Sequence, residues 1–463
     1  MAARKGSLLI PITVGSAFFM EGLDATILTT ALPQIAKDFG VAAPEVGGAI
    51  TSYLLSLAIF IPVSGWVADR FGAKRTYCAA LVVFTLGSAL CAMATGPLWL
   101  ALARGVQGLG GALLTPVGRL ILARSFPKDE LIHAMSFMII PGLIGPVVGP
   151  VLGGFIATYT SWHWIFLINL PLGALGLALA LVYLPDIDGG GASTAFDFRG
   201  FGLIVLALAP LQFALESLAA AHVSWTTTGA LLVISAAGLL AYIAHARTHA
   251  RPLIDLNLLR IRTFAVAVGA GFLSRVAIAS APFLLPILFQ SAFGMTALHS
   301  GLLVFSMAVG QLVMRMWTTP MLRALGVRNS LALNGVCIGL STVGFALLTE
   351  PRADWIVFVY GFVCGLSQCV QLSVLAALHF SGVEPDAASR ATAFSSVTQR
   401  FAAAFGVAIS ASLLQAFGGS HLRAADFNAV FLIVGAIALA AVPFYLMLRQ
   451  GDGADLMAKG AKS

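Results

Sequence analysis

The segment FMEGLDATILTTALP, residues 19–33, contains two carboxylates, Glu21 and Asp24, in a run that is otherwise apolar or small. On a helix, residues three apart share a face, so both acids would point the same way. In a medium of low dielectric, two nearby carboxylates raise each other's affinity for a proton, so one of them could load and release a proton near neutral pH. Proton-coupled carriers require this chemistry. The alternative is a structural ion pair between either acid and an arginine.

Arginines also fall within apolar parts of the chain, at Arg104, Arg119, Arg275, Arg315 and Arg400. A charge in the interior of a bilayer costs about 2.5 kcal/mol or more, so such residues usually face a cavity or a partner. We predict a polar substrate cavity lined by Arg275, Arg400, Gln107, Gln371 and Gln399. Its positive charge would suit an anionic substrate, or would need Glu21 and Asp24 as partners. For Arg315 we favour snorkelling to the inner interface.

The composition is that of an integral membrane protein. Of 463 residues, 59% are hydrophobic and 10% are charged, and the mean hydropathy is +0.95, whereas soluble domains are about a quarter charged. Segments of about 20 apolar residues, the length that crosses a bilayer core of roughly 30 Å, recur fourteen times. They are residues 8–32, 47–68, 77–94, 97–123, 132–159, 164–184, 200–219, 227–246, 264–292, 300–321, 330–348, 355–379, 391–417 and 427–448.

The distribution of basic residues predicts the orientation in the membrane. If the first segment runs from inside to outside, only three of the 26 Lys and Arg residues lie in outer loops and five lie within spans, which leaves 18 on the inner side. We therefore expect a multi-pass protein of a bacterial-type inner membrane with both termini in the cytoplasm. The net charge of +7 follows from this topology, and no nucleic-acid partner is expected.

Two polar interruptions divide the chain. Residues 184–200 form a glycine-rich linker, and residues 245–264 have the pattern of a short amphipathic helix at the inner membrane surface. We predict a six-helix bundle over residues 1–185, a linker with two extra membrane helices and the amphipathic segment over 186–262, a second six-helix bundle over 263–450, and a cytoplasmic tail over 451–463.

A faint internal repeat relates the two predicted bundles. The loop DRFGAKR, residues 69–75, is similar to RALGVRN, residues 323–329, and this match aligns Gly72 with Gly326 at an offset of 254 positions. The same offset places Glu21 on Arg275. An acid in the first helix would then have an arginine as its pseudo-symmetric counterpart, which raises the question of whether the two side chains pair.

Signals of an enzyme are missing from the sequence. The segment GLGGALLTP has no G-K-[ST] and follows no strand, so a phosphate loop is not expected. The eight histidines show no metal-ligand spacing, and no Ser/His/Asp set is suggested. We therefore expect no cofactor and no metal, and energy that comes from a proton gradient.

Several motifs, in order along nearly the whole chain, resemble those of the major facilitator superfamily, in its fourteen-helix branch of drug:proton antiporters of the EmrB/QacA type. The segments are LDATILTTALP (23–33), GWVADRFGAKR (65–75), RGVQG (104–108), GPVVGPVLGG (145–154) and WHWIFLINLPLG (162–173). The resemblance implies an all-α integral membrane fold of two six-helix bundles plus two extra transmembrane helices.

The resemblance also implies roles for particular residues. Asp24 would be the proton-coupling residue, with Glu21 as a second acid, and Arg104 would respond to the protonation. Residues of the first inner loop would form a latch that stabilises the outward-facing state, namely Gly65, Asp69, Arg70, Gly72, Lys74 and Arg75. Residues of the antiporter motif would form a hinge and seal, namely Gly145, Gly149, Pro150, Gly153 and Gly154. Independently of the family, Gly65 should permit close helix approach, and the glycines at every fourth position should form a groove for another helix.

The sequence thus favours a secondary transporter, specifically a proton-coupled antiporter that exports amphipathic drugs or other toxic small molecules by alternating access. Its partners would be the small-molecule substrate, protons and the lipid bilayer; outer-membrane or adaptor partners are left open. Export of an organic anion or metabolite is the alternative, because of the arginines. A non-transporting membrane enzyme or sensor is the remaining class, and it would require a clustered catalytic set or a large extramembrane domain.

Overall fold

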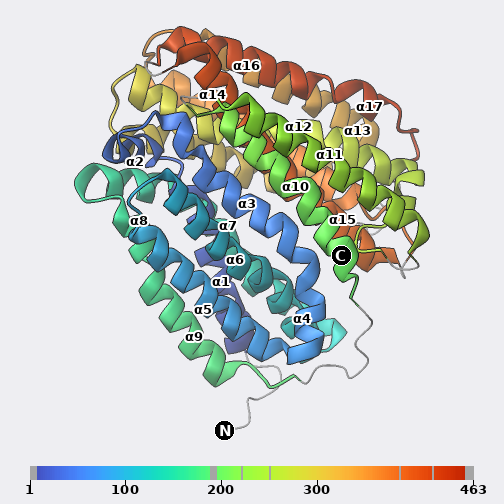
Figure 1. The fold of residues 1–463 in the computed structure, drawn as a ribbon. Coiled ribbons are helices and arrows are strands. Elements are labelled where there is room, and N and C mark those ends of the chain that lie inside the picture. The colour runs from blue at the N-terminus through green and yellow to red at the C-terminus, as the bar shows by residue number, and fades with distance from the viewer. Residues whose placement is uncertain are drawn as a thin grey trace. The chain divides into compact units, whose positions relative to one another are not determined.

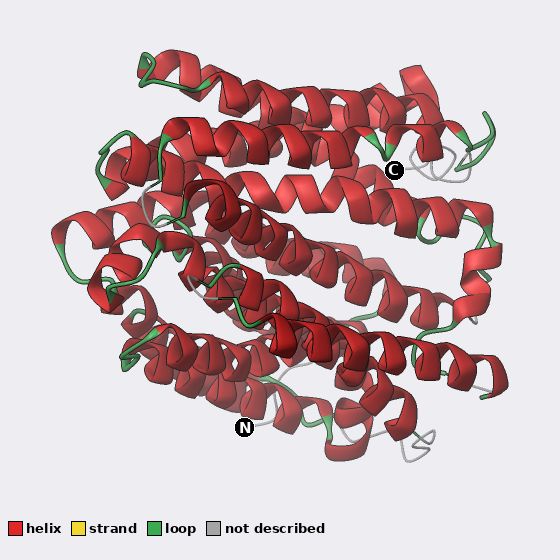
Figure 2. Cartoon of the chain, turned by 45° about the horizontal axis from the view of Figure 1, so that its top comes forward, coloured by secondary structure: helices red, strands yellow, loops and turns green. Residues whose placement is uncertain are grey.

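The structure is a computed structural model that describes residues 8–187, 196–220, 223–249, 252–384, 387–419 and 422–453. These residues form helices joined by turns and short loops, without a strand among them (Figure 2). The chain divides into two compact units, Met1–Phe196 and Asp197–Ser463. The linker predicted at 184–200 and the tail predicted at 451–463 lie partly outside the described residues.

The first unit begins with α1 and ends after α9 (Figure 1). Its helices are α1 (Leu9–Ile27), α2 (Leu32–Phe39), α3 (Gly48–Phe60), α4 (Ser64–Phe71), α5 (Ala73–Ala92), α6 (Pro97–Ser125), α7 (Lys128–Tyr159), α8 (His163–Leu167) and α9 (Asn169–Tyr183). Helix α6 packs against both α3 and α5, and α1 packs most extensively against α7. Tyr77 and Phe84 of α5 and Leu114 and Ile121 of α6 are fully buried in its core.

The second unit contains the remaining helices (Figure 1). They are α10 (Phe198–Leu218), α11 (Trp225–Thr248), α12 (Arg262–Ile287), α13 (Ala297–Gly344), α14 (Asp354–Leu378), α15 (Ala388–Gly418), α16 (Ala424–Leu439) and α17 (Val442–Leu446). The two extra membrane helices, α10 and α11, pack against each other, and α10 packs on α15. Ile204 of α10 and Tyr242 of α11 share an apolar cluster with Phe264 of α12 and Phe394 of α15.

Twelve helices of the described residues are long and apolar enough to cross a membrane. One of them, at Ala297–Leu347, includes α13, whose 48 residues cover two of the predicted spans and are interrupted by non-helical backbone at Gly326. Helix α1 is not among the twelve; its 19 residues, which include Glu21 and Asp24, would still extend about 28 Å. Counting α13 as two spans and adding α1 to the twelve gives the fourteen spans predicted from the sequence.

Two glycines with left-handed backbone separate consecutive helices at equivalent places in the two units. Gly72 lies between α4 and α5 with φ of 89° and ψ of 141°, and Gly326 lies inside α13 with φ of 73° and ψ of 166°. These are the residues that the internal repeat aligns, and side chains other than glycine rarely adopt such backbone angles. The shared conformation supports this alignment of the two loops.

The amphipathic helix predicted near residues 245–264 is shorter than expected. Residues 250 and 251 lie outside the described residues, and Leu256–Arg260 forms one 3₁₀ turn of five residues. Asp255 caps this turn by accepting from the backbone N–H of Asn257 at 3.0 Å. Leu258 is buried in the cluster that contains Ile204, Tyr242 and Phe264, so the segment joins the core of the second unit.

Substitution of Gly326 by alanine tests whether the positive φ at this turn requires glycine. We expect Gly326→Ala to lower the free energy of unfolding by about 1–2 kcal/mol, because alanine at a positive φ is strained. An added Cβ at Gly326 would meet no described atom within 4 Å, so the effect should come from the backbone alone. Gly269→Ala, in α12 with equally open space around the new Cβ, is the matched control and should leave stability unchanged or slightly higher. Equal melting temperatures of the two purified variants would contradict the prediction.

Candidate functional site

Asp24, in the last turn of α1, is buried and surrounded by donors from two other helices. Its Oδ2 accepts from Arg104 Nη1 of α6 at 2.5 Å. Its Oδ1 accepts from Gln107 Nε2 of α6 at 2.8 Å and from Asn169 Nδ2 of α9 at 2.9 Å. All four side chains are at most 1% exposed. A buried charge is tolerated only when it is paired and hydrogen-bonded, and Asp24 meets both conditions.

Arg104 has partners of its own that hold it in place. Its Nη1 also donates to Gln107 Oε1 at 2.8 Å, and its Nε donates to the carbonyl of Ala49 in α3 at 3.2 Å. The guanidinium lies over the ring of Tyr53 in α3, 4.2 Å from its centroid, where a cation is attracted by the π face. The network therefore joins α1, α3, α6 and α9 around a single pair of opposite charges.

Asn169 and Gln107 were not predicted as partners of Asp24. Gln107 was assigned to the substrate cavity, but it lies in this network, and Asn169 had no assigned role although it lies in the quoted segment WHWIFLINLPLG. Asn169 Nδ2 also contacts Ser88 Oγ of α5 at 3.0 Å, and Ser88 donates to the carbonyl of Phe166. An asparagine within an apolar span is itself a signal, because amides in membranes usually hydrogen-bond across helices.

Glu21 lies on the same helix as Asp24 but contacts a different residue of α6. Its Oε2 accepts from Thr115 Oγ1 at 2.6 Å, and its side chain is buried. Thr115 is two turns beyond Gln107 along α6, so both acids of α1 face this helix at different levels. Arg275 belongs to the other unit, and the predicted pairing of Glu21 with Arg275 stays a prediction.

The glycines of the predicted antiporter motif bring α7 against α1. A Cβ added at Gly145 would lie 2.6 Å from the carbonyl oxygen of Phe19, and one at Gly153 would clash with the carbonyl oxygen of Ile27. At Gly149 the clash would be with Thr26 Oγ1, two residues after Asp24. Gly154 is also buried, and Pro146 and Pro150 lie within α7. The helix that carries Asp24 thus lies almost backbone to backbone against α7.

The predicted latch residues lie around the turn at Gly72. Asp69 pairs with Arg124 at the end of α6 at 2.9 Å, and Lys74 lies 3.8 Å from Asp186. Arg70 and Arg75 are exposed. A Cβ at Gly65 would meet no described atom within 4 Å, so the close helix approach predicted there is not seen.

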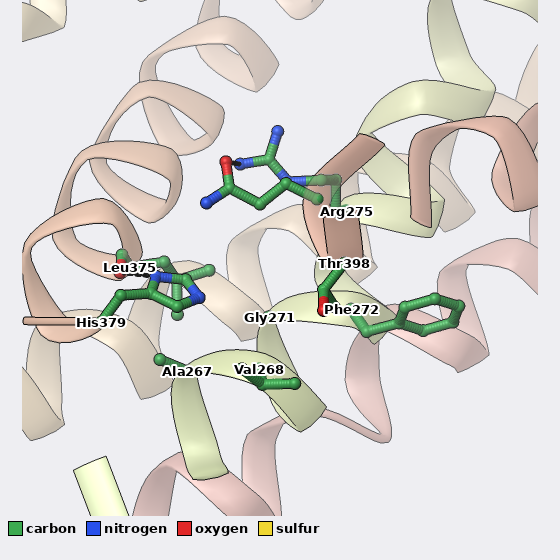
Figure 3. Close-up of a pocket in the computed structure, with 9 residues that line it drawn as sticks. Ala267, Val268, Gly271, Phe272, Arg275, Leu375, His379 and Thr398 are labelled. Carbon is green, nitrogen blue, oxygen red and sulfur yellow. Dashed lines mark hydrogen bonds between the residues drawn. The ribbon is translucent and has the colours of Figure 1, made fainter. Parts of the chain in front are cut away.

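In the second unit, Arg275 of α12 lines a small pocket with His379, which follows α14, and Gln399 of α15. Its Nη2 donates to Gln399 Oε1 at 3.0 Å. Arg275 and His379 point toward the same space, with Gly271 and Phe272 below (Figure 3). Among the described residues of this unit, no carboxylate forms an ion pair with Arg275.

The other predicted cavity residues are placed differently. Arg400 follows Gln399 on α15, close enough to act on Arg275 electrostatically. Gln371 is fully buried away from the pocket lining and donates to Ser274 Oγ at 3.3 Å. The second unit therefore brings together Arg275, Arg400 and Gln399 of the predicted set.

His379 is buried, and its Nδ1 lies 2.5 Å from the carbonyl oxygen of Leu375. Burial disfavours the charged imidazolium and lowers the pKa of His379 to about 4, although the backbone hydrogen bond opposes the shift; the positive charge of Arg275 adds to the lowering. His379 is therefore neutral at physiological pH and contributes an aromatic wall with one exchangeable proton.

The prediction that no histidines have metal-ligand spacing is wrong. His245 and His249 are four residues apart at the end of α11, and the structure brings them to Asp197, which precedes α10. The segment HARTH could have been recognised as H-x₃-H, but Asp197 is 48 positions earlier in the chain, and sequence spacing does not indicate such a partner.

The sequence model of the Major Facilitator Superfamily matches residues 14–351 and 267–456. The chain belongs to this superfamily. It is 35% identical over 445 residues to the protein named "Putative multidrug resistance protein MdtD" of Klebsiella pneumoniae subsp. pneumoniae, with 95% of this chain and 94% of the relative covered. The protein of the same name from Pectobacterium carotovorum is 34% identical, with 89% and 88% covered.

Solved structures of other transporters share the fold. A POT family transporter in complex with 5-aminolevulinic acid aligns with a TM-score of 0.70 at 15% identity, covering 96% of this chain and 97% of that one. A D-xylose-proton symporter aligns with a TM-score of 0.66 at 15% identity, covering 96% and 98%. The predicted major facilitator fold and the resemblance to its drug:proton antiporters are confirmed. This superfamily member is a multi-pass membrane transporter, not an enzyme.

The lowered pKa of His379 predicts a dependence of stability on pH. The folded state takes up this proton only near pH 4, whereas an unfolded histidine takes it up near pH 6.5, so stability should be complete above about pH 6.5 and fall as pH drops toward 4. The slope should be at most about 1.4 kcal/mol per pH unit. Melting temperatures of purified protein between pH 7.5 and 4.5 measure it. His379→Gln should flatten the curve and His133→Gln, at an exposed position, should not; parallel curves for all three proteins would contradict the assignment.

Proposed function

We propose that this transporter is a proton-coupled antiporter that exports amphipathic drugs or other toxic small molecules across a bacterial-type inner membrane by alternating access. The observation that carries the proposal is the buried Asp24 carboxylate, with Arg104, Gln107 and Asn169 as its donors. The names of the multidrug resistance relatives support the class of substrate. The excess of basic residues in the predicted inner loops supports cytoplasmic termini.

Protonation of Asp24 would change what holds α1 to α6 and α9. The ionised carboxylate accepts three hydrogen bonds, one of them from a guanidinium, and such charge-assisted bonds are stronger than neutral ones. A proton on Asp24 removes the ion pair with Arg104 and turns one carboxyl oxygen into a donor. Each tenfold difference in proton affinity between two conformations contributes about 1.4 kcal/mol to their balance.

The packing of α1 on α7 would transmit the effect of Asp24 protonation to α7. Because the glycines of α7 leave no room between the two backbones, α1 cannot shift appreciably without carrying α7 along. We propose that α1 and α7 move as a pair against α6 and α9 when Asp24 is protonated. Pro146 and Pro150 in α7 leave backbone carbonyls without their usual N–H partners, which favours bending there.

Asp24→Asn should abolish proton coupling, because the amide keeps the shape of the carboxyl group but binds no proton. In inverted vesicles, addition of substrate should collapse a preformed pH gradient with the wild type and not with the variant. Asp38→Asn, at an exposed residue that accepts from Trp162 Nε1 at 2.7 Å, is the matched control and should behave as the wild type. Gradient collapse by Asp24→Asn at the wild-type rate would exclude the role of Asp24 in coupling.

A second candidate is the export of an organic anion, favoured by the pocket at Arg275. A guanidinium there has an amide and a neutral imidazole beside it, and Arg400 adds positive charge. Arginine binds carboxylates through two parallel hydrogen bonds. No carboxylate in the described part of this unit forms an ion pair with Arg275, so that geometry is open to a substrate.

Arg275→Gln separates the two candidates. If anions bind at this pocket, the variant should lose about tenfold or more of its transport of an aromatic carboxylate such as salicylate. Export of a cationic dye such as ethidium should change by less than about twofold. Arg315→Gln, at an exposed arginine outside the pocket, should leave both activities intact. Absence of salicylate transport by the wild type in proteoliposomes would exclude the anion candidate and leave the first proposal standing.

A further inference from the structure

Asp197 joins three segments at one end of the α10–α11 hairpin. As the residue before α10, it accepts from the backbone N–H of Gly200 at 2.8 Å through Oδ1. Its Oδ2 accepts from the backbone N–H of Leu253, in the segment that leads to α12, at 3.3 Å. His245 Nε2, in the last turn of α11, lies 2.9 Å from Oδ1 and 3.0 Å from Oδ2. A single carboxylate thus connects the start of α10, the end of α11 and the following segment.

The Asp197 side chain is 4% exposed and that of His245 is 9% exposed. Burial alone would raise the pKa of Asp197, but the hydrogen bonds from Gly200, His245 and Leu253 outweigh it, and the pKa lies below its ordinary value. The imidazole of His245 lies within hydrogen-bond distance of both carboxylate oxygens.

His249 places a second imidazole beside the first. It lies four residues after His245, so both side chains project from the same face of the helix end, and the ring centroids are 4.9 Å apart. One ligand atom from each of Asp197, His245 and His249 can be chosen so that all three lie within 4.8 Å of one another. In a tetrahedral zinc site with bonds of about 2.0–2.1 Å, ligand atoms are about 3.4 Å apart. Small rotations of the two rings would supply the difference.

We propose that Asp197, His245 and His249 bind a zinc ion. Two imidazoles and a carboxylate are a donor set that zinc prefers, and His249 is exposed, which leaves a fourth position open to water. The ion would bind the same Nε2 and carboxylate oxygen atoms that lie within hydrogen-bond distance of each other in its absence. Hydrogen bonds from Gly200 and Leu253 then orient the ligating carboxylate from behind, as in zinc sites whose ligands are held by outer partners.

The bound ion acts as a clamp on the extra helices. It ties the start of α10 to the end of α11, next to Tyr242, which hydrogen-bonds both the N–H and the carbonyl of Ile254 at 2.7 and 2.9 Å. Since a ligand that binds only the folded state stabilises it by mass action, zinc stabilises this part of the second unit. The site is independent of Asp24 and of any proton coupling.

The chain contains a built-in comparison. His299 and Asp354 form another histidine–carboxylate pair, with Nε2 and Oδ1 2.9 Å apart. Both side chains are exposed, and no third ligand joins them in the clusters formed by the described residues. Because this pair has no third ligand, it serves as the control for the weak zinc binding expected of an ordinary surface histidine and carboxylate.

The test uses the purified full-length protein with an affinity tag that contains no histidine. Equilibrium dialysis against zinc chloride should give one zinc per chain, with saturation at micromolar zinc or below, and saturating zinc should raise the melting temperature by about 3 °C or more, reversibly with EDTA. His249→Gln, at an exposed position that does not endanger folding, should weaken binding at least about tenfold, and Asp197→Asn should do the same. His299→Gln should bind as the wild type.

Two outcomes would overturn the proposal. Dialysis could show no saturable zinc below about 100 μM, or His249→Gln could bind as tightly as the wild type, which would mean an adventitious ion only. Transport assays are not needed for either result, so failure here leaves the proposed antiport untouched, and loss of antiport leaves the zinc site untouched.

Discussion

The first unit is organised around the cost of placing one carboxylate where water cannot reach it. Asp24 is tolerated inside α1 because Arg104, Gln107 and Asn169 donate hydrogen bonds to it from two other helices. Arg104 is held in turn by a backbone carbonyl and an aromatic ring of α3. The mutual attraction of such a pair only roughly offsets its desolvation, so the pair contributes little net stability. The pair instead specifies how the helices pack, because only one arrangement of them provides Asp24 with all of its hydrogen-bond donors.

That arrangement needs α1 to be held from its other side as well. The glycines of α7 allow the two backbones to approach so closely that side chains cannot intervene. Without a hydrophobic driving force between helices in lipid, such contacts and interhelical hydrogen bonds are what hold a bundle together. Polar attraction on one face of α1 and backbone contact on the other therefore work together, and both concern the residues between Phe19 and Ile27. The second unit has no such acid in its equivalent helix, where Arg275 has an amide as its hydrogen-bond partner.

Hydropathy, motif order and charge distribution were sufficient to predict the fourteen spans and the superfamily, and they singled out Asp24 and Arg104, which the structure pairs. The weak match of Gly72 with Gly326 was informative because a positive φ restricts residue choice so strongly. Partners that come from distant segments could not be predicted: Asn169 lies 145 positions from Asp24, and Asp197 lies 48 positions from His245. The close approach of another helix at Gly65 was predicted from the residue type alone. In the structure no described atom lies within 4 Å of a Cβ added there, because the residue type does not determine which helices pack together.

Arg104, Gln107 and Asp24 form a closed triangle, because the arginine donates to both of the others and the glutamine donates to the acid. If Asp24 changes its charge, Arg104 and Gln107 can remain hydrogen-bonded to each other. Neutralising Asp24 would leave Arg104 with an amide oxygen at 2.8 Å, so the cation is never stripped of every partner at once. In the proposed mechanism, Gln107 would therefore lower the energetic cost of protonating Asp24, because Arg104 would keep a hydrogen-bond acceptor.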